Sequence, residues 1–248
     1  MTEKRAFFWI TSGGRFADEA SFSAHQVAKH MPDIPRIHFT TNVNFLDERF
    51  VTFTMAKKYD VWYLQSTWMM TEALKIMQDK GYRSVVYMDT DTYMIEPVYE
   101  LFDLPRTFDI SGAHAPGRKT CAHMEDRLPS GLFPEINIGV NPMFAPTALG
   151  LWHTALEAYE RWEDEYNKDQ DDGNDQGPLR DAMISHLINN ENFRMYIMPP
   201  EYNCRFILPC FLNGRVKILH GRNPDLAKIV ADINAREGMR LWRPYQLV

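Results

Sequence analysis

The sequence predicts an α/β fold in which a mixed central sheet is covered by helices on both faces. Short apolar segments rich in β-branched and aromatic residues, typical of buried strands, alternate along the chain with longer segments whose apolar residues recur at helical spacing. The 248 residues are 45% hydrophobic, enough to bury a substantial core in a single domain spanning 1–248. Small or polar residues follow several predicted strands, and ligands bind at such strand ends in sheets of this kind.

The first half of the chain is predicted to alternate between strands and helices. The first apolar segment ends in the small residues Thr11, Ser12 and Gly13, which let a ligand approach the backbone closely. Prolines after residue 31 end the first helix, and Gly81 ends the second. The predicted elements are a strand over 6–10, a helix from about 18 to 30, a strand over 36–41, a helix over 62–80 and a strand over 85–88.

The second half continues the alternation and contains one long irregular segment. Residues 114–134 are rich in Gly, Pro and charge, which predicts a long surface loop near the ligand-binding strand ends. Loops of this length in compact domains are functional lids or disordered segments. We expect a short helical turn from residue 96, strands over 108–113 and 136–144, helices over 148–166 and 178–189, and strands near 195–198 and 216–219.

The composition excludes several classes of function. The net charge is −6 and the longest charge-rich stretch, 163–175, is acidic, so no basic face predicts binding to nucleic acid. The three cysteines, Cys121, Cys204 and Cys210, lack a Cys-x-x-Cys pair; this argues against a disulfide framework or a zinc site and favours a reducing compartment. No apolar segment reaches the length of a signal-peptide core or a membrane span, so we expect a cytoplasmic protein without a membrane span.

Two carboxylates follow the predicted strand over 85–88. Asp89 and Asp91, separated by Thr90, end the apolar run abruptly, as expected where the tip of a buried strand opens into a cleft. Mg²⁺ and Mn²⁺ are held in proteins by one or two carboxylates together with substrate phosphates, so the spacing indicates a site for a metal and a diphosphate. The alternative is a turn with a helix cap, since Asp and Thr both bond to free backbone N–H groups.

A histidine stands in a similar place after the predicted strand over 216–219. His220 is followed by Gly221, which gives a phosphate room to approach the backbone. The alternative interpretation of a lone histidine at a strand end is a hydrogen-bonded structural residue. With Asp89 and Asp91 it would complete a set of two oxygen ligands and one nitrogen ligand, which suits Mn²⁺ better than Mg²⁺, although Mg²⁺ also fits.

Five short segments spread over most of the chain carry a family resemblance. They are 85–91 (Val-Val-Tyr-Met-Asp-Thr-Asp), 136–140 (Ile-Asn-Ile-Gly-Val), 175–176 (Asp-Gln), 199–203 (Pro-Pro-Glu-Tyr-Asn) and 219–221 (Leu-His-Gly). In this order they resemble the GT-A fold glycosyltransferases, and more narrowly the retaining family that includes glycogenin and bacterial lipopolysaccharide galactosyltransferases. The resemblance implies a Rossmann-like nucleotide-diphospho-sugar transferase fold. It also implies transfer of a hexose, with retention, from a nucleotide-sugar donor, with UDP as the usual nucleotide, to a glycan or another hydroxyl acceptor.

The resemblance implies a role for each matching residue. Asp89, Asp91 and His220 would hold the metal. The other implied roles are nucleotide binding by Thr11, Ser12, Gly13 and Thr90, sugar binding by Asn137, Gly139 and Asp175, catalysis by Asp175 and Gln176, and diphosphate binding by Gly221, Arg222 and Lys228. Apart from the family pattern, Asn137 also fits a buried side chain bonded to backbone, and Asp175 fits a helix cap ahead of Pro178.

The chain departs from the family at two basic positions. The helix before the acidic strand has Ser-Thr-Trp-Met-Met at 66–70 where the family commonly has an Arg or Lys. The family's final Lys-Pro-Trp is also missing, and Arg222 is the preferred substitute because a guanidinium binds phosphate oxygens in pairs.

Two other functions therefore stay open. One is a sugar-nucleotide or glycan-binding module without turnover. The other is a phosphatase of the haloacid-dehalogenase type, whose nucleophile loop also has Asp-x-Asp after an apolar strand. Such loops carry Thr or Val where this chain has Tyr93, and they usually lie near the start of the domain.

Overall fold

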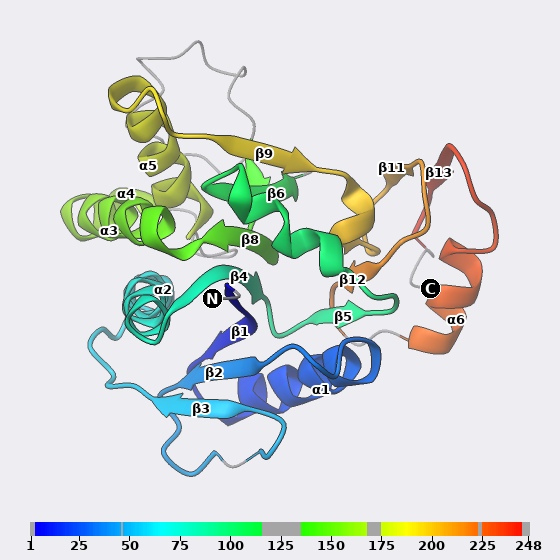
Figure 1. Cartoon of the computed structure of the whole chain (residues 1–248), viewed down its shortest axis with the longest axis horizontal. Coiled ribbons are helices and arrows are strands. Elements are labelled where there is room, and N and C mark those ends of the chain that lie inside the picture. The colour runs from blue at the N-terminus through cyan, green and yellow to red at the C-terminus, as the bar shows by residue number, and fades with distance from the viewer. Residues whose placement is uncertain (1–2, 46, 116–134, 168–174, 223–224, 245–248) are drawn as a thin grey trace.

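A mixed eight-stranded sheet runs through the centre of the molecule (Figure 1). The computed structural model describes residues 3–45, 47–115, 135–167, 175–222 and 225–244. The strand order is β3-β2-β1-β4-β8-β6-β7, with β9 beside β6; the strands from β3 to β4 are parallel to one another, and β8 is antiparallel to β4 and β6. The strands are β1 (Lys4–Thr11), β2 (Arg36–Thr40), β3 (Val51–Thr54), β4 (Tyr82–Met88), β6 (Ile110–His114), β7 (Ile136–Asn137), β8 (Val140–Phe144) and β9 (Met195–Met198).

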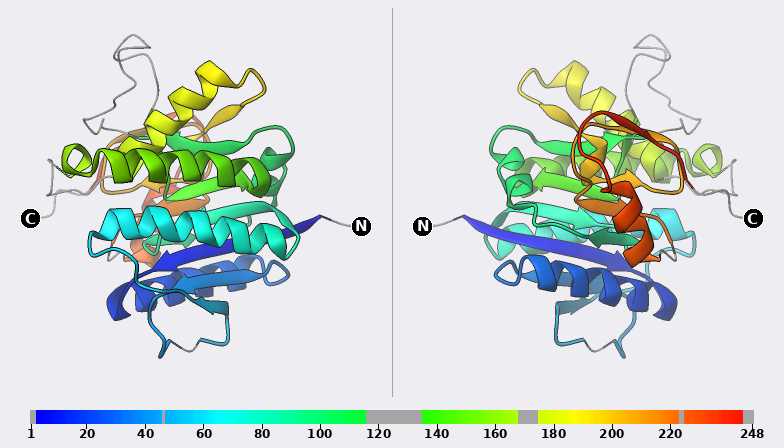
Figure 2. Two further views of the ribbon diagram at one scale, coloured as in Figure 1. Left: turned by 90° about the vertical axis from the view of Figure 1, so that its left-hand side faces the viewer. Right: turned by 90° about the vertical axis from the view of Figure 1, so that its right-hand side faces the viewer.

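Helices cover both faces of this sheet, as the sequence predicts. Alternate residues of β1 point to opposite sides, so Phe8 packs in the core beneath α2, α3 and α5, whereas Trp9 packs against α1. Both side chains are fully buried. Figure 2 shows α2 and α3, cyan and green, on one face of the sheet and α1, blue, on the other. The helices are α1 (Gly14–His30), α2 (Trp62–Asp79), α3 (Ala145–Arg161), α4 (Glu163–Tyr166), α5 (Gln176–Asn189) and α6 (Leu226–Ile233).

Two smaller sheets lie beside the carboxyl end of β4. One has the order β10-β12-β5, and the other pairs β11 with β13. They share a core of their own, which includes Tyr93, Leu219 and Ile229. The bounds are β5 (Thr92–Met94), β10 (Cys204–Arg205), β11 (Cys210–Leu212), β12 (Ile218–His220) and β13 (Arg240–Trp242), and short 3-10 helices occur at η1 (Tyr99–Phe102), η2 (Leu104–Arg106) and η4 (Pro200–Tyr202).

Most predicted elements are present, but several differ in extent. The predicted strand over 136–144 is two strands, β7 and β8, because the chain turns at residues 138–139. The predicted helix over 148–166 starts earlier, at Ala145, and is broken at Trp162 into α3 and α4. The first helix also begins earlier, at Gly14, while β12 begins only at Ile218. The short strands β3, β5, β10, β11 and β13 are not predicted from sequence.

The sequence also predicts a long surface loop and no membrane span. The predicted surface loop over 114–134 lies outside the described residues, apart from His114 and Ala115. Among the helices that the structure describes, none combines the length and the apolar character needed to cross a bilayer.

Candidate metal centre between β4, β5 and β12

The two aspartates lie in a tight turn that joins the large sheet to the small one. β4 ends at Met88 and β5 begins at Thr92, whose amide and hydroxyl groups donate hydrogen bonds of 3.2 and 2.6 Å to the carbonyl oxygen of Asp89. The amide of Asp89 donates to the carbonyl of Gly139 at 2.8 Å, and the amide of Gly221 donates to the carbonyl of Asp91 at 2.9 Å. Backbone groups therefore hold the turn, and no helix follows Asp91, so the helix-cap alternative is wrong.

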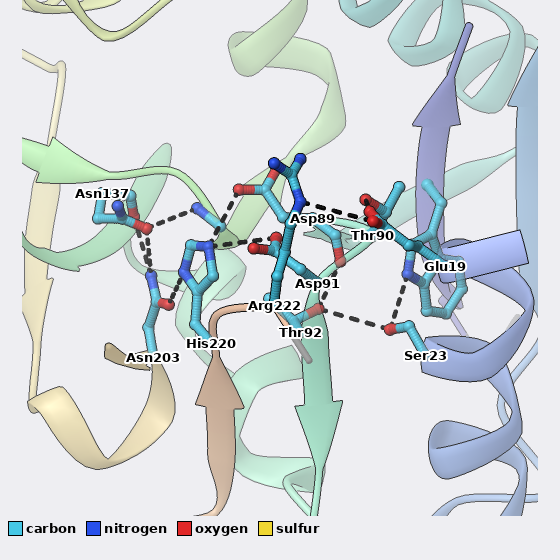
Figure 3. A network of polar contacts seen from close by, with 12 residues as sticks. Glu19, Ser23, Asp89, Thr90, Asp91, Thr92, Asn137, Asn203, His220 and Arg222 are labelled. Atoms are coloured by element: carbon cyan, nitrogen blue, oxygen red, sulfur yellow. Dashed lines mark hydrogen bonds and ion pairs between the residues drawn. The ribbon is translucent and has the colours of Figure 1, made fainter. Parts of the chain in front are cut away.

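His220 meets both carboxylates. β12 pairs antiparallel with β5, which sets His220 opposite Thr92. Its Nε2 lies 3.5 Å from Asp89 Oδ2 and 3.4 Å from Asp91 Oδ1 (Figure 3). One ligand atom from each of the three side chains falls within 4.8 Å of the others, and His220 is buried while the carboxylates are half-buried. The structure thus brings together the three residues for which the sequence predicts metal binding.

A chain of amides orients the imidazole of His220. Asn203 Nδ2 donates to the backbone carbonyl of Asn137 at 3.2 Å and to its Oδ1 at 2.9 Å, which leaves Asn203 Oδ1 facing His220 Nδ1 at 2.8 Å. A backbone carbonyl only accepts, so the amide orientation of Asn203 is fixed and His220 Nδ1 must carry the proton. Nε2 is therefore the nitrogen directed at Asp89 and Asp91, as metal-binding histidines require.

Asn137 and Gly139, the predicted sugar-binding residues, pack around His220. Asn137 Oδ1 accepts from the amide of Gly139 at 3.0 Å, and the Asn137 side chain is buried. A Cβ atom on Gly139 would lie 2.9 Å from Asn137 Oδ1 and closer still to the ring of His220. Only glycine fits there without displacing the imidazole. The alternative interpretation of Asn137, a buried side chain that bonds to its neighbours, describes its hydrogen bonds, and its contact with a sugar stays a prediction.

Burial and neighbouring groups shift the pKa values of Asp89 and Asp91. The Tyr87 hydroxyl donates to Asp89 Oδ1 at 2.8 Å. Burial raises the pKa of Asp89, the charge of His220 opposes this rise, and Asp91 adds to it. Burial also acts on Asp91, but the hydrogen bond and charge of His220 and the charge of Arg222 outweigh it and hold the pKa of Asp91 at about 2. The pair therefore keeps negative charge that a bound cation would neutralise.

Asp175 lies within electrostatic reach of the centre. Burial, followed by the charge of Asp89, raises the pKa of Asp175 to about 7. It precedes the first residue of α5, Gln176, yet its side chain makes no capping hydrogen bond within the described part of the chain. The helix-cap alternative therefore describes the position of Asp175 but not its bonding.

α1 contributes a residue that the sequence does not single out. Glu19 Oε2 accepts from the Thr90 hydroxyl at 2.9 Å, and Glu19 Oε1 lies 3.5 Å from Arg222 Nε. The Arg222 guanidinium also lies 5.5 Å from the ring of Phe16, which is stacked on Trp62. Arg222 is half exposed beside the aspartates and is thereby available to an anion. A single acidic residue within a helix carries no sequence signal for such a role.

The remaining residues predicted to bind the nucleotide or the diphosphate are Thr11, Ser12, Gly13 and Lys228. Thr11 is fully buried: its hydroxyl lies 2.8 Å from His38 Nε2 and donates to Thr40 at 3.0 Å, and its carbonyl accepts from the amide of Thr41 at 3.2 Å. Neither its side chain nor its carbonyl is exposed to a nucleotide. Ser12 is half-buried and Gly13 is exposed ahead of α1. Lys228 is exposed on α6, and its amide donates to the capping side chain of Asp225.

One cavity of the described structure lies away from this centre. It measures about 820 Å³ and is lined by α1 residues that include Gly14, Ala17 and Asp18, which form a different face of the helix from Glu19. The metal centre is thus defined by its side chains and not by this cavity. Comparison with protein-family models and with curated proteins gives no match for this chain.

Proposed function

We propose that this protein is a metal-dependent glycosyltransferase of the GT-A fold. It would move a hexose from a nucleotide-diphosphate sugar, with a UDP-sugar as the expected donor, to a hydroxyl group of a glycan or another acceptor. The observation that carries the proposal is the convergence of Asp89, Asp91 and His220, whose ligand atoms lie within 4.8 Å of one another although His220 is far from the aspartates in sequence.

The carboxylate oxygens of Asp89 and Asp91 and the imidazole nitrogen of His220 fit Mn²⁺ or Mg²⁺. Two carboxylates would satisfy either Mg²⁺ or Mn²⁺, and the imidazole nitrogen favours Mn²⁺. Asn203 supports this fit because it occupies Nδ1 of His220 and leaves Nε2 toward the carboxylates. Asp89, Asp91 and His220 would hold the cation, which when bound supplies positive charge to the diphosphate of the donor.

Neighbouring side chains supply the remaining chemistry of sugar transfer. The Arg222 guanidinium, beside Asp91 and only weakly paired with Glu19 at 3.5 Å, is suited to bind the oxygens of the leaving diphosphate, where negative charge increases during the reaction. Asp175, whose charge interacts with that of Asp89, is suited to bind hydroxyl groups of the transferred sugar, with Gln176 next to it. We propose that the sugar is transferred with retention while Asp175 and Gln176 steady it.

The test is a panel of nucleotide-sugars incubated with the protein and Mn²⁺, with donor hydrolysis and product formation measured by chromatography. We expect turnover of at least one UDP-hexose and a rise in melting temperature with UDP plus Mn²⁺. Asp89→Ala should abolish both. Asp103→Ala is the matched control, because Asp103 is an exposed residue paired with Arg106 and should behave as wild type. Unchanged metal-dependent turnover in Asp89→Ala would reject the site.

The same experiment separates the two alternative functions. A thermal shift with UDP and Mn²⁺ but no donor hydrolysis across the panel would identify a binding module that lacks turnover. Release of phosphate from simple monoesters, with no action on nucleotide-sugars, would identify a phosphatase instead.

A further inference from the structure

Two cysteine thiols that show no motif in the sequence lie side by side in the smaller sheets. Cys204 Sγ and Cys210 Sγ are 3.7 Å apart. Cys204 is fully buried and Cys210 is half-buried, and both are free thiols. A pair of thiols at this distance, with one residue buried and the other half-buried, has the arrangement of a reactive thiol and its resolving partner.

The surrounding strands hold the two sulfurs in place. Cys204 belongs to β10 and pairs with Leu219 of β12, while Cys210 belongs to β11 and pairs with Trp242 of β13. The segment between the cysteines is folded back on itself, since the amide of Leu208 donates to the carbonyl of Arg205 at 2.8 Å. The Trp242 indole also donates to the carbonyl of Phe206 at 2.8 Å, which ties β13 to the same segment.

We infer that Cys204 and Cys210 are an oxidant-sensitive modification site that closes a reversible disulfide. The co-reactant is a hydroperoxide. The Cys210 thiolate attacks one peroxide oxygen, the O–O bond breaks, and the sulfur becomes a sulfenic acid while the leaving oxygen takes up a proton. Cys204 sulfur then attacks Cys210 sulfur, the S–O bond breaks, and the thiol proton leaves with the hydroxide as water. The two thiols are oxidised, the peroxide is reduced, and a dithiol reductant reverses the change.

The assignment of Cys210 as the attacking sulfur follows from its surroundings. It is the more exposed of the two thiols. The hydrogen bond between the thiols lowers the pKa of Cys210 and, together with burial, raises the pKa of Cys204. Because the thiolate is the nucleophile, the half-buried Cys210 reacts first and the buried Cys204 resolves it.

Formation of the disulfide would also affect the proposed metal centre, and this part of the inference rests on the proposed function. A disulfide requires the sulfurs to approach by about 1.7 Å. Asn203, which orients His220, directly precedes Cys204, and Arg205 pairs with His220 across β10 and β12. Phe206 packs against Gly221, where a Cβ would lie 2.9 Å from its ring. A shift of β10 would therefore disturb the hydrogen bond to His220, and we expect about tenfold weaker Mn²⁺ binding in the oxidised protein.

The first measurement is the disulfide itself. The full chain is treated with hydrogen peroxide, denatured, alkylated with N-ethylmaleimide and analysed by mass spectrometry with and without prior reduction. We expect the loss of two hydrogens, a cross-linked peptide pair containing Cys204 and Cys210, and an alkylated Cys121. In Cys204→Ser, the sulfenic acid of Cys210 should accumulate and react with dimedone, whereas Cys210→Ser should give no such adduct. Equal alkylation of all three cysteines after oxidation, or a cross-link that includes Cys121, would overturn the inference.

The second measurement is Mn²⁺ affinity by titration calorimetry before oxidation, after oxidation and after re-reduction. Recovery of the full affinity on reduction is expected, and a Cys204→Ala/Cys210→Ala double variant should not respond to peroxide. An unchanged affinity in fully oxidised protein would refute the coupling to the metal centre. If the reduced protein binds no Mn²⁺ while the disulfide forms, the proposed function fails and the modification site stands.

Discussion

The contact between Gly139 and the ring of His220 gives a sharp test of the candidate metal centre. The φ angle of Gly139 is not positive, so the backbone accepts alanine and Gly139→Ala isolates the steric effect. The new Cβ would meet the His220 ring at less than van der Waals separation. The ring must retreat by about 1 Å to restore an ordinary contact.

A displacement of this size is large against the tolerances of the site. His220 Nδ1 and Asn203 Oδ1 are 2.8 Å apart, so a further 1 Å or so breaks their hydrogen bond. Metal–ligand distances tolerate only about 0.2 Å. We therefore expect Gly139→Ala to weaken Mn²⁺ binding by about 100-fold or more, close to the effect of His220→Ala, and to destabilise the protein by about 1–3 kcal/mol.

Urea unfolding and Mn²⁺ titration of single and double variants measure both effects. In a His220→Ala background most of the clash is gone, so adding Gly139→Ala should cost less than about 1 kcal/mol. Gly150→Ala is the matched control, because nothing lies within 4 Å of its added Cβ on α3 and alanine favours the helix. If Gly139→Ala bound Mn²⁺ within about threefold of wild type, the placement of His220 against this glycine would be refuted.

Three other expectations follow from contacts near the centre. Asn203→Ala leaves His220 Nδ1 without its acceptor and should weaken Mn²⁺ binding by about tenfold in calorimetry; no change would mean that Asn203 does not orient the ring. The folded pKa of Asp175, about 7, exceeds its ordinary 3.8, so the folded state loses stability as pH rises from about 4 to 7. Asp175→Asn should therefore stabilise the metal-free protein by roughly 2 kcal/mol at pH 8 but not at pH 4, as thermal melts in chelator can check, and an equal effect at both pH values would contradict this. Glu135→Gln removes the charge that pairs with buried Arg180 at 2.9 Å and should cost about 3–5 kcal/mol in urea unfolding; a loss below about 1 kcal/mol would show that the pair is not desolvated.

The metal ligands could be predicted from sequence because they are polar residues at the ends of apolar strands: Asp89 and Asp91 lie in the turn after β4, and His220 is the last residue of β12. Asp89 and His220 interrupt runs that otherwise belong to the core, and a strand end is where a buried segment reaches the surface. The alternation of β1 between two cores follows from the same pattern, since Phe8 and Trp9 are both apolar and must both be covered. These are local signals, and they led to the correct sheet class.

What the sequence did not predict depends on pairing between distant segments. β5 and β10 are only three and two residues long, too short for a periodic signal, yet their pairing with β12 sets His220 beside the aspartates. The turn at residues 138–139 falls in a segment where apolar residues alternate with Asn and Gly as in one strand, so the predicted single strand was wrong. The approach of Cys204 and Cys210 likewise depends on the turn between them and on the pairing of their strands with distant segments, which the cysteine spacing does not reveal.

The position of the turn between two sheets makes the centre dependent on both. Asp89 is anchored through its amide to Gly139, next to β8 of the large sheet, and Asp91 is anchored through its carbonyl to Gly221, next to β12 of the small one. One face of the small sheet has a core of its own, but Met94 and Ile218 on its other face pack in the core of the large sheet. His220 comes from the small sheet and β4, which leads into Asp89, belongs to the large one, so the packing between the two sheets holds the ligands together. Metal binding should in turn stabilise the junction between the sheets more than either sheet alone.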